Sequence, residues 1–159
     1  MNTKRFIALA GALAATLALP IGGSAKASEF LAAQSQGGAA HAKLVLRIEG
    51  LPSSDGQLLI GLYDAEDGYK TDQELIGKTV KVDDTVVEVV FDNLLVGRYA
   101  FKVFHDENSD GELNTNFMGI PSESYGFSNN ASDPFSAPEW KETRFSLPRG
   151  RMTQTIDLS

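Results

Sequence analysis

The chain has 159 residues, a formal net charge of −7 and no cysteine. That length suits one domain with a substantial core. The acidic balance argues against binding to nucleic acid or to an anionic membrane surface, since both need clustered Lys and Arg. The lack of cysteine excludes disulfides, thiol catalysis and cysteine-ligated zinc.

The first 27 residues have the order of a secretory signal peptide. "MNTKR" is basic, "FIALAGALAATLALPIGG" is apolar, and "SAKA" places Ala25 and Ala27 at a cleavage motif. A transmembrane anchor is the alternative, but the apolar run is short and Pro20 interrupts it. The sequence therefore predicts an exported protein, periplasmic or secreted, that begins at Ser28. Cleavage removes three basic residues and no acid, so the formal net charge becomes −10.

Residues 28–42 show no sustained period and predict a flexible lead-in. From Lys43 onward, apolar and polar residues alternate, as in strands that turn one face to a core. The alternating runs are "KLVLRIE", "QLLIGLY", "TVKV", "TVVEVVF", "RYAFKVFH", "KETRFSL" and "MTQTIDL". Turn-forming Gly, Pro and Asp separate them, and residues 64–77 are compatible with one helical turn.

This pattern predicts an all-β domain over residues 43–159. We expect a single antiparallel β-sandwich, transthyretin-like or immunoglobulin-like, with about seven strands and one long functional loop. Alternation predicts a shared core of Leu58, Ile60, Val87, Val89, Tyr99, Phe101 and Val103.

The long connection runs from Asp106 to about Glu139. Unstructured loops of this length are uncommon in compact domains and are often functional. The surrounding residues 103–140 include seven acids and no Lys or Arg. Within them, Asp106, Asn108, Asp110 and Gly111 form D-x-N-x-D-G, the first half of a calcium loop of the EF-hand kind.

The match to an EF-hand stops there, because Phe117 stands at the twelfth place, where an EF-hand has Glu. A β-protein loop could recruit a later carboxylate instead. The candidate calcium ligands are Asp106, Asn108, Asp110, Glu112, Asn114 and Glu123. The alternative is an Asx-rich turn without an ion, whose side chains cap its own backbone. The crowded carboxylates favour a cation.

Aromatic side chains follow the acidic stretch. Tyr125 and Phe127 could offer stacking faces to a sugar or peptide; alternatively, Phe117, Ile120, Tyr125 and Phe127 fold back and cover the end of the sandwich, which we favour. The candidate ligand contacts are His105, Asn116, Tyr125, Phe127 and Asn129. Strand alternation predicts that His105 is a buried, hydrogen-bonded histidine rather than a base.

The segments "GLYDAEDGY" and "FDNLLVGRYAFKVFHDENSDGELNTNFMGIPSESYGFSNNA" resemble the bacterial family called domain of unknown function 2141. The resemblance covers Leu44 to near Leu147. It implies an exported protein with a transthyretin-like or carboxypeptidase-regulatory β-sandwich and no assigned activity. Asn114 stands where many relatives have Asp, which would weaken a cation site by one charge. The matching positions are His105, Asp106, Glu107, Asn108, Asp110, Gly111, Asn114, Thr115, Asn116, Gly119, Pro121, Glu123, Tyr125, Gly126, Phe127, Ser128 and Asn129.

Two classes of function remain. The first is an exported binding module whose calcium-ordered loop presents a contact surface to a protein or glycan partner. The second is an enzyme that uses His105 with nearby carboxylates or Tyr125. The first is favoured, because the acid–base groups are better explained as metal ligands and turn formers, and no G-x-S-x-G motif is present. No catalytic residue is assigned, calcium is the one expected cofactor, and no membrane span is expected after cleavage.

Overall fold

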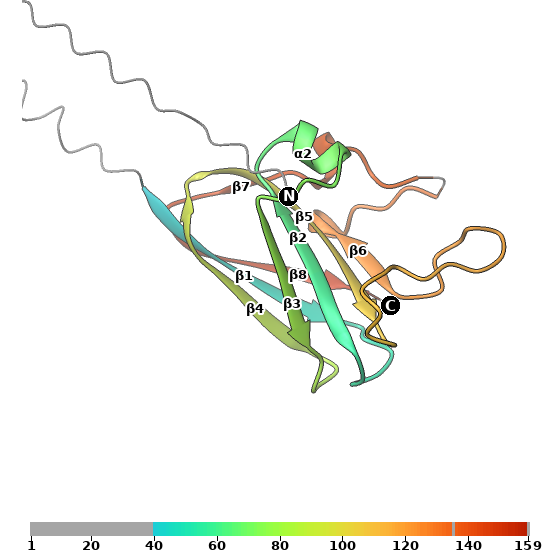
Figure 1. Ribbon diagram of the computed structural model, residues 1–159. Helices are drawn as coiled ribbons and strands as arrows, with labels where there is room; N and C mark the ends of the chain where they lie inside the picture. The colour runs from blue at the N-terminus through green and yellow to red at the C-terminus, as the bar shows by residue number, and fades with distance from the viewer. Residues whose placement is uncertain (1–39, 135, 159) are drawn as a thin grey trace, which may run out of the picture. The chain divides into compact units, whose positions relative to one another are not determined.

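Eight strands in two sheets form about half of the part of the chain that the structure describes (Figure 1). The structure is a computed structural model, and it describes residues 40–134 and 136–158. The expected signal peptide, and the expected lead-in up to residue 39, lie outside the described residues. Among the residues described, no helix is long and apolar enough to cross a membrane. The predicted all-β sandwich-like fold is confirmed.

The first sheet has the strand order β4–β1–β8. Its strands are β1 (His41–Glu49), β4 (Val87–Leu95) and β8 (Gly150–Asp157). The β1–β4 pair is antiparallel, but β1 and β8 are parallel, which differs from the expected antiparallel arrangement. Strand β1 also begins at His41, two residues earlier than the predicted domain boundary.

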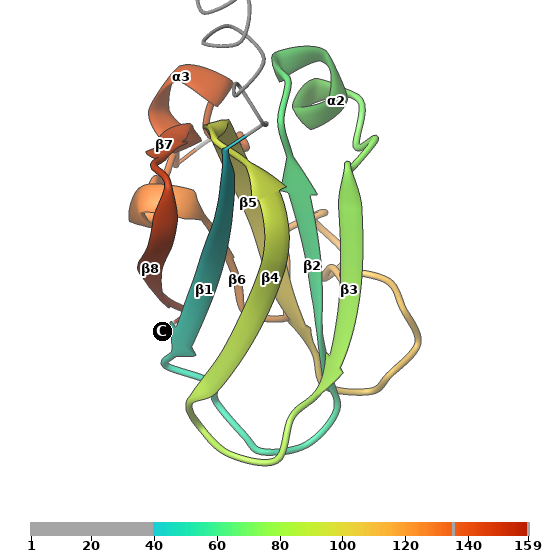
Figure 2. The same cartoon turned by 90° about the vertical axis from the view of Figure 1, so that its left-hand side faces the viewer.

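The second sheet has the strand order β3–β2–β5–β6, and a further short strand, β7, also pairs with β5. Its strands are β2 (Gln57–Tyr63), β3 (Ile76–Lys81), β5 (Gly97–Asp106), β6 (Tyr125–Phe127) and β7 (Phe145–Leu147). All of these pairs are antiparallel. Figure 2 shows the two layers, with β1 and β4 in the foreground and β5 and β6 behind them.

The core lies between the sheets, where alternation places one face of each long strand. All of the predicted core residues are buried there. Leu44, Leu46 and Ile48 of β1 are fully buried, and they meet Phe101 and Val103 of β5 in the same cluster. Period-two alternation therefore located this core correctly.

Two short helices, α2 (Glu66–Lys70) and α3 (Trp140–Thr143), lie at one end of the sandwich (Figure 2). The helical turn expected within residues 64–77 is confirmed by α2. The run "KETRFSL" was expected to be a strand throughout, but its first residues belong to α3. Glu139 and Glu142 form a capping box that starts this helix.

The helices cover part of the outer face of the second sheet. Tyr69 of α2 and Trp140 of α3 pack with Tyr63 and Ala100 of the sheet in a second apolar cluster. The Tyr69 hydroxyl donates to the Pro138 carbonyl oxygen at 2.8 Å, which ties α2 to the segment before α3. Among the described residues, no helix lies over the rest of this outer face (Figure 1).

The connection between Asp106 and Glu139 is more ordered than expected. It contains strand β6 and the short 3-10 helix η1 (Ser128–Asn130). The buried Ser128 hydroxyl accepts a hydrogen bond from the Phe101 backbone N–H at 3.0 Å, so η1 continues the edge that β6 forms on β5. Residues 107–124 remain as a loop, here called the loop, and residues 131–134 and 136–139 also have no helix or strand.

Candidate functional site

The loop begins at Asp106, a fully buried residue at the end of β5. Its carboxylate accepts hydrogen bonds from the Gln57 side chain (2.8 Å) and from the backbone N–H groups of Gly111 (2.8 Å) and Asp110 (3.2 Å). Burial alone would raise the pKa of Asp106, but hydrogen bonds from Gln57, Gly111, Asp110 and Ser109 outweigh it and hold the pKa below its ordinary value. Asp106 is therefore an ionised anchor for the turn that follows.

Glu123 anchors the other end of the loop. Its carboxylate oxygens accept hydrogen bonds from the backbone N–H groups of Glu107 at 3.1 Å and Asn114 at 2.9 Å. Glu123 is almost fully buried. The Glu123 carboxylate thus binds the backbone at the start of the loop and near its middle. Together with the Asp106 carboxylate, it forms the hydrogen-bonded framework of the loop.

Asp110, Asn108 and Asn114 meet in front of this framework. The Asn108 amide nitrogen donates to Asp110 Oδ2 and to Asn114 Oδ1, at 2.9 Å each. Asp110 Oδ1 accepts from the Glu112 backbone N–H at 2.9 Å, and this bond, followed by the amides of Asn108 and Asn114, lowers the pKa of Asp110. Oxygens of Asp110 and Asn114 thus converge on one point, where the Asn108 amide lies.

This arrangement bears on both interpretations of the acidic stretch. The Asn108 and Asp110 side chains accept backbone N–H groups two residues ahead, as in an Asx-rich turn. Among the residues that the structure describes, no three acidic or histidine side chains gather as a metal centre made of such groups alone requires. Any cation here would therefore depend on amide and backbone oxygens as well as on carboxylates.

The loop continues as a small hairpin that ends in apolar side chains. Thr115 and Pro121 form an isolated bridge, and the Asn116 side chain accepts from the backbone N–H groups of Met118 (2.9 Å) and Ile120 (3.2 Å). We name Phe117, Met118 and Ile120 the loop tip. Their exposed fractions are 97%, 66% and 52%.

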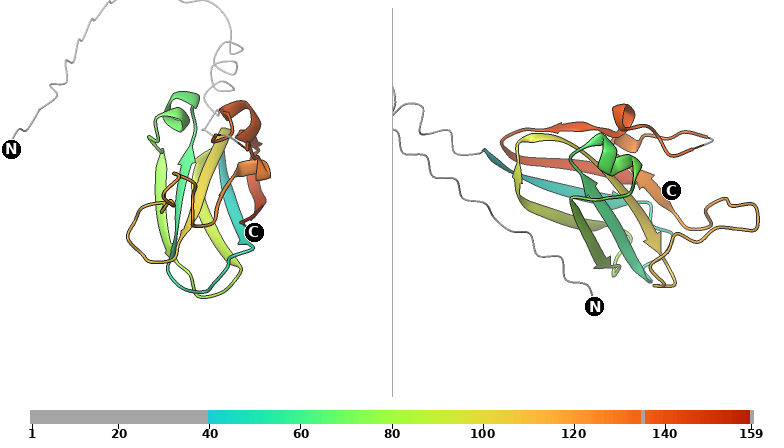
Figure 3. Two further views of the ribbon diagram at one scale, coloured as in Figure 1. Left: turned by 90° about the vertical axis from the view of Figure 1, so that its right-hand side faces the viewer. Right: turned by 45° about the horizontal axis from the view of Figure 1, so that its top comes forward.

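The favoured expectation that Phe117, Ile120, Tyr125 and Phe127 fold back over the end of the sandwich is wrong for Phe117 and Ile120, which are exposed. Figures 1 and 3 show that the loop extends away from the sheets instead. The reason is that Asn116 and the Thr115–Pro121 bridge close the hairpin on its own backbone. Its hydrogen bonds are satisfied without contact to the sandwich.

His105 is buried, as predicted. One ring nitrogen, Nε2, lies 2.7 Å from the Asp55 carbonyl oxygen, and the other, Nδ1, is buried without a hydrogen-bond partner among the described residues. Because a carbonyl oxygen can only accept, Nε2 carries a hydrogen and donates it to Asp55. His105 does not line the groove that Tyr125 and Phe127 form on the outer face of the second sheet.

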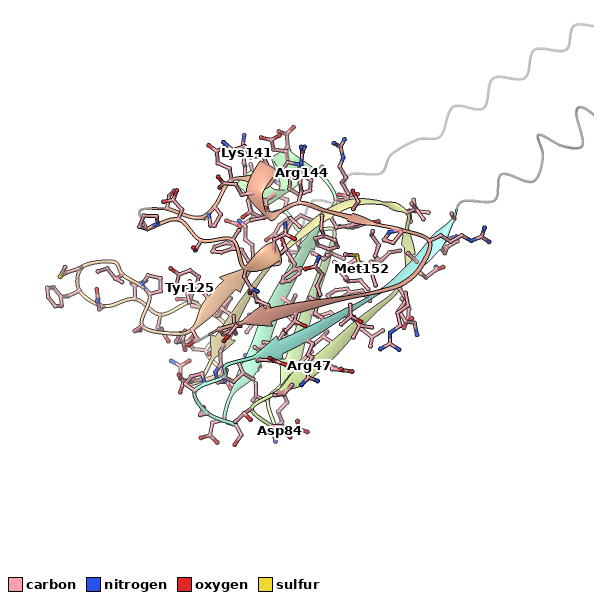
Figure 4. The ribbon with its side chains drawn as sticks, turned by 180° about the vertical axis from the view of Figure 1, so that it is seen from behind. Arg47, Asp84, Tyr125, Lys141, Arg144 and Met152 are labelled. Carbon is pink, nitrogen blue, oxygen red and sulfur yellow. The ribbon has the colours of Figure 1, made fainter. Side chains whose placement is uncertain are left out.

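The other predicted site residues do not gather at one site. Glu112 is exposed. Asn129 lies outside the loop, and its side-chain amide donates to the carbonyl oxygens of Glu142, Thr143 and Arg144 at the C-terminal end of α3. Tyr125 and Phe127 lie together on β6 with their rings edge to face, 5.9 Å between centroids. Figure 4 shows Tyr125 where the loop returns to the sheet.

Tyr125 and Phe127 line a groove on the outer face of the second sheet that sequence reasoning missed. Register places two rows of residues across this face: Thr79, Leu59, Phe104 and Tyr125 in one row, and Gly77, Gly61, Lys102 and Phe127 in the other. The groove has a volume of about 500 Å³. A signal was present in the sequence, because Leu59 and Phe104 are apolar residues at positions that alternation turns away from the core.

Comparison with known proteins identifies one family. The model of the family described as "Uncharacterized protein conserved in bacteria (DUF2141)" matches residues 46–155. The match includes the whole loop and seven of the eight strands completely or in large part. No curated protein and no solved structure gave a match.

Proposed function

The chain belongs to the uncharacterized bacterial family DUF2141, and from that premise we propose that it is an exported, non-enzymatic binding module. In this proposal, a calcium-ordered loop presents a contact surface to a protein or glycan partner. Export is inferred from the basic, apolar and Ala-x-Ala order of residues 1–27. The loop tip is the contact surface.

One observation supports the proposal: the loop tip is apolar and exposed, while the base of the loop is held by hydrogen bonds to two buried carboxylates. Asp106 and Glu123 are buried and hold the loop backbone through charged hydrogen bonds. Phe117, Met118 and Ile120 at the tip are exposed. Exposed clusters of large apolar side chains on a soluble domain mark interaction sites, and a preformed loop loses little conformational entropy when it binds.

Calcium is proposed to bind where the oxygens of Asp110 and Asn114 converge. Carboxylate and amide oxygens are ligands that calcium accepts. The fit is partial, since the Asn108 amide nitrogen must turn away before an ion can approach those oxygens. Weak binding follows, in the range of extracellular calcium modules, about 10⁻⁴–10⁻³ M.

A crosslinking experiment tests the contact surface. A photo-reactive benzoylphenylalanine replaces Phe117 in the loop tip, and the matched control carries it at Leu95, which is 53% exposed at the end of β4. We expect a discrete crosslinked product in intact cells from position 117 and none from position 95. A chelator added to isolated cell envelopes should reduce the yield. Identical products from both positions would show that the tip is not a specific contact surface.

A further inference from the structure

The groove on the outer face of the second sheet has a pair of glycines in its floor. Gly61 of β2 and Gly77 of β3 are direct cross-strand partners, and their neighbour in the same row is Lys102 of β5. All three lie on the face opposite to the core, and because the glycine pair has no side chains of its own, the side chains of Tyr63 and Glu74 can lie directly over it. The volume of about 500 Å³ lies within the range of small-molecule sites.

One side of the groove is apolar and aromatic. Phe104 and Leu59 are half-buried, and Tyr125 is 45% exposed. Phe127 packs edge to face against Tyr125, and Leu113 of the loop completes this wall. The rings are held by strand pairing to β5, so they form a rigid surface on which a flat apolar group could stack.

The other side of the groove is polar. A methyl group at Gly61 would come within 2.8 Å of the Tyr63 hydroxyl oxygen, and one at Gly77 within 3.1 Å of a Glu74 carboxylate oxygen. These two polar groups therefore lie at the glycine floor, with Asp72 beside them. Burial, followed by the negative charges of Asp72 and Glu74, raises the pKa of Tyr63, which stays a neutral donor.

Two lysines line the groove, and both already have partners: Lys78 Nζ donates to the Val90 carbonyl oxygen at 2.6 Å. Lys102 Nζ donates to the Tyr69 carbonyl oxygen at 2.8 Å and to Asp72 at 2.5 Å, and it lies 4.3 Å from the centroid of the Tyr69 ring. A cationic ligand would have to displace Lys102 from these aromatic and acidic partners. An anionic ligand would approach the carboxylates of Asp72 and Glu74. The site therefore suits an uncharged ligand.

The backbone beneath the groove also limits the ligand. Strands β2 and β5 are central in the sheet and are hydrogen-bonded on both sides. Their backbone groups are therefore taken and cannot pair with an added peptide strand. Recognition must come from side chains, through ring stacking on one wall and hydrogen bonds to carboxylate and phenol groups on the other.

From these features we propose that the groove binds a neutral saccharide, whose C–H face stacks on the Tyr125 ring beside Phe127 and whose hydroxyl groups bond to Glu74, Asp72 and Tyr63. This inference rests on the proposed function as a binding module and names a partner class for it. The saccharide would lie on the sheet face, separate from the partner that contacts the loop tip, and its binding requires no calcium.

The test is a titration of the isotope-labelled protein, residues 28–159, with neutral oligosaccharides, monitored by NMR. The probes are cellotetraose, maltotetraose and tetra-N-acetylchitotetraose, each used up to millimolar concentration in the presence of a chelator. We expect at least one probe to cause saturable shifts at β2, β3, β5 and β6. Absence of saturable shifts with all three probes, or shifts confined to the loop tip, would overturn the inference.

Two matched pairs of variants locate the site. Tyr125→Ala removes the exposed wall ring and should weaken binding about tenfold or more, whereas Phe117→Ala removes a tip ring and should leave it unchanged. Gly77→Val adds a side chain without a strained backbone at a place 3.1 Å from the Glu74 carboxylate, so it should displace that carboxylate and also abolish binding. Gly97→Val, at the start of β5, would meet only ordinary van der Waals contacts and should not affect binding. Melting temperatures verify that all four variants fold.

The two proposals can fail separately. Saccharide binding in chelator without any crosslink from position 117 would support the groove and contradict the loop tip. Crosslinking from position 117 without saccharide binding would support the loop tip as a contact surface and contradict the saccharide groove. Equal binding by Gly77→Val and the wild type would show that the saccharide does not occupy the groove.

Discussion

Gly56 lies so close to Asp106 that a Cβ atom on the glycine would come within 2.2 Å of the Asp106 carbonyl oxygen. Gly56 also has a positive φ of 74°, and its turn brings Gln57 next to the Asp106 carboxylate. The turn before β2 and the start of the loop are thus fitted to each other. The loop is anchored to the sandwich at a point where no side chain can be accommodated.

Gly56→Ala should therefore destabilise the domain by about 2–4 kcal/mol, from backbone strain together with the clash. Gly111→Ala is the matched control, because Gly111 has a φ of 84° but no atom within 4 Å of the place that a methyl group would take. It should cost about 1 kcal/mol, from strain alone. Urea unfolding measures both, and equal losses would contradict the close fit at Gly56.

Stability should fall in acid because of Asp106. Its folded-state pKa is below the ordinary value, so its contribution is complete above about pH 4 and is lost as the pH falls through the folded pKa. Asp106→Asn should cost about 1–3 kcal/mol at neutral pH, since an amide nitrogen would face backbone donors. The variant should also lose less stability than the wild type on acidification. Parallel acid dependence of the two unfolding free energies would argue against this role.

Calcium should raise the melting temperature by a few degrees at millimolar concentration, since an ion bound only to the folded state stabilises it by mass action. Magnesium should do less, because it gives up its water reluctantly. Asp110→Ala removes a converging oxygen and should abolish the calcium response. Calorimetric titration that shows no heat, together with an unchanged melting temperature, would leave the loop as an Asx-rich turn.

Two phenylalanines should respond oppositely to truncation. Phe101→Ala empties a fully buried position in the core and should cost about 3–5 kcal/mol. Phe117→Ala removes a ring that is almost fully exposed and should change stability by less than about 0.5 kcal/mol. Urea unfolding of both variants checks this, and a large loss for Phe117→Ala would mean that the tip packs on the domain.

Export should leave a mature protein that begins at Ser28. The intact mass of protein recovered from the periplasm or culture medium should equal that of residues 28–159. A full-length chain recovered with the membrane fraction would instead identify the first 27 residues as an anchor.

The fold was largely predictable because its core follows a simple rule. Alternation in the long strands placed Leu44, Phe101 and Val103 correctly, since one face of each strand is buried. The rule does not give strand direction, so the parallel pairing of β1 with β8 was missed. It also failed at α3, where a capping box and the burial of Trp140 prevail over the strand pattern.

The candidate site was predicted only in part. The acidic composition identified Asp106 and Glu123 as candidate site residues. It could not predict which backbone N–H groups they bind, because those groups come near only when the turn is folded. The exposure of Phe117 was not predictable, because a hairpin that closes on itself has no sequence signal as strong as apolar alternation. The glycine floor was missed for a different reason: Gly61 and Gly77 become neighbours only through the register of β2 and β3.

The parallel pairing of β1 and β8 should make the domain resist a pulling force that acts along these two strands. The two strands are paired over eight positions, from Ala42–Gly150 to Glu49–Asp157, so the start of β1 and the end of β8 lie at opposite ends of the ladder. A force that pulls these two ends apart acts along the strands and loads the hydrogen bonds together, whereas an antiparallel hairpin pulled at its open end loses them one at a time. Unfolding under such a force is set by the unfolding rate, and this ladder must shear as a unit before the core opens.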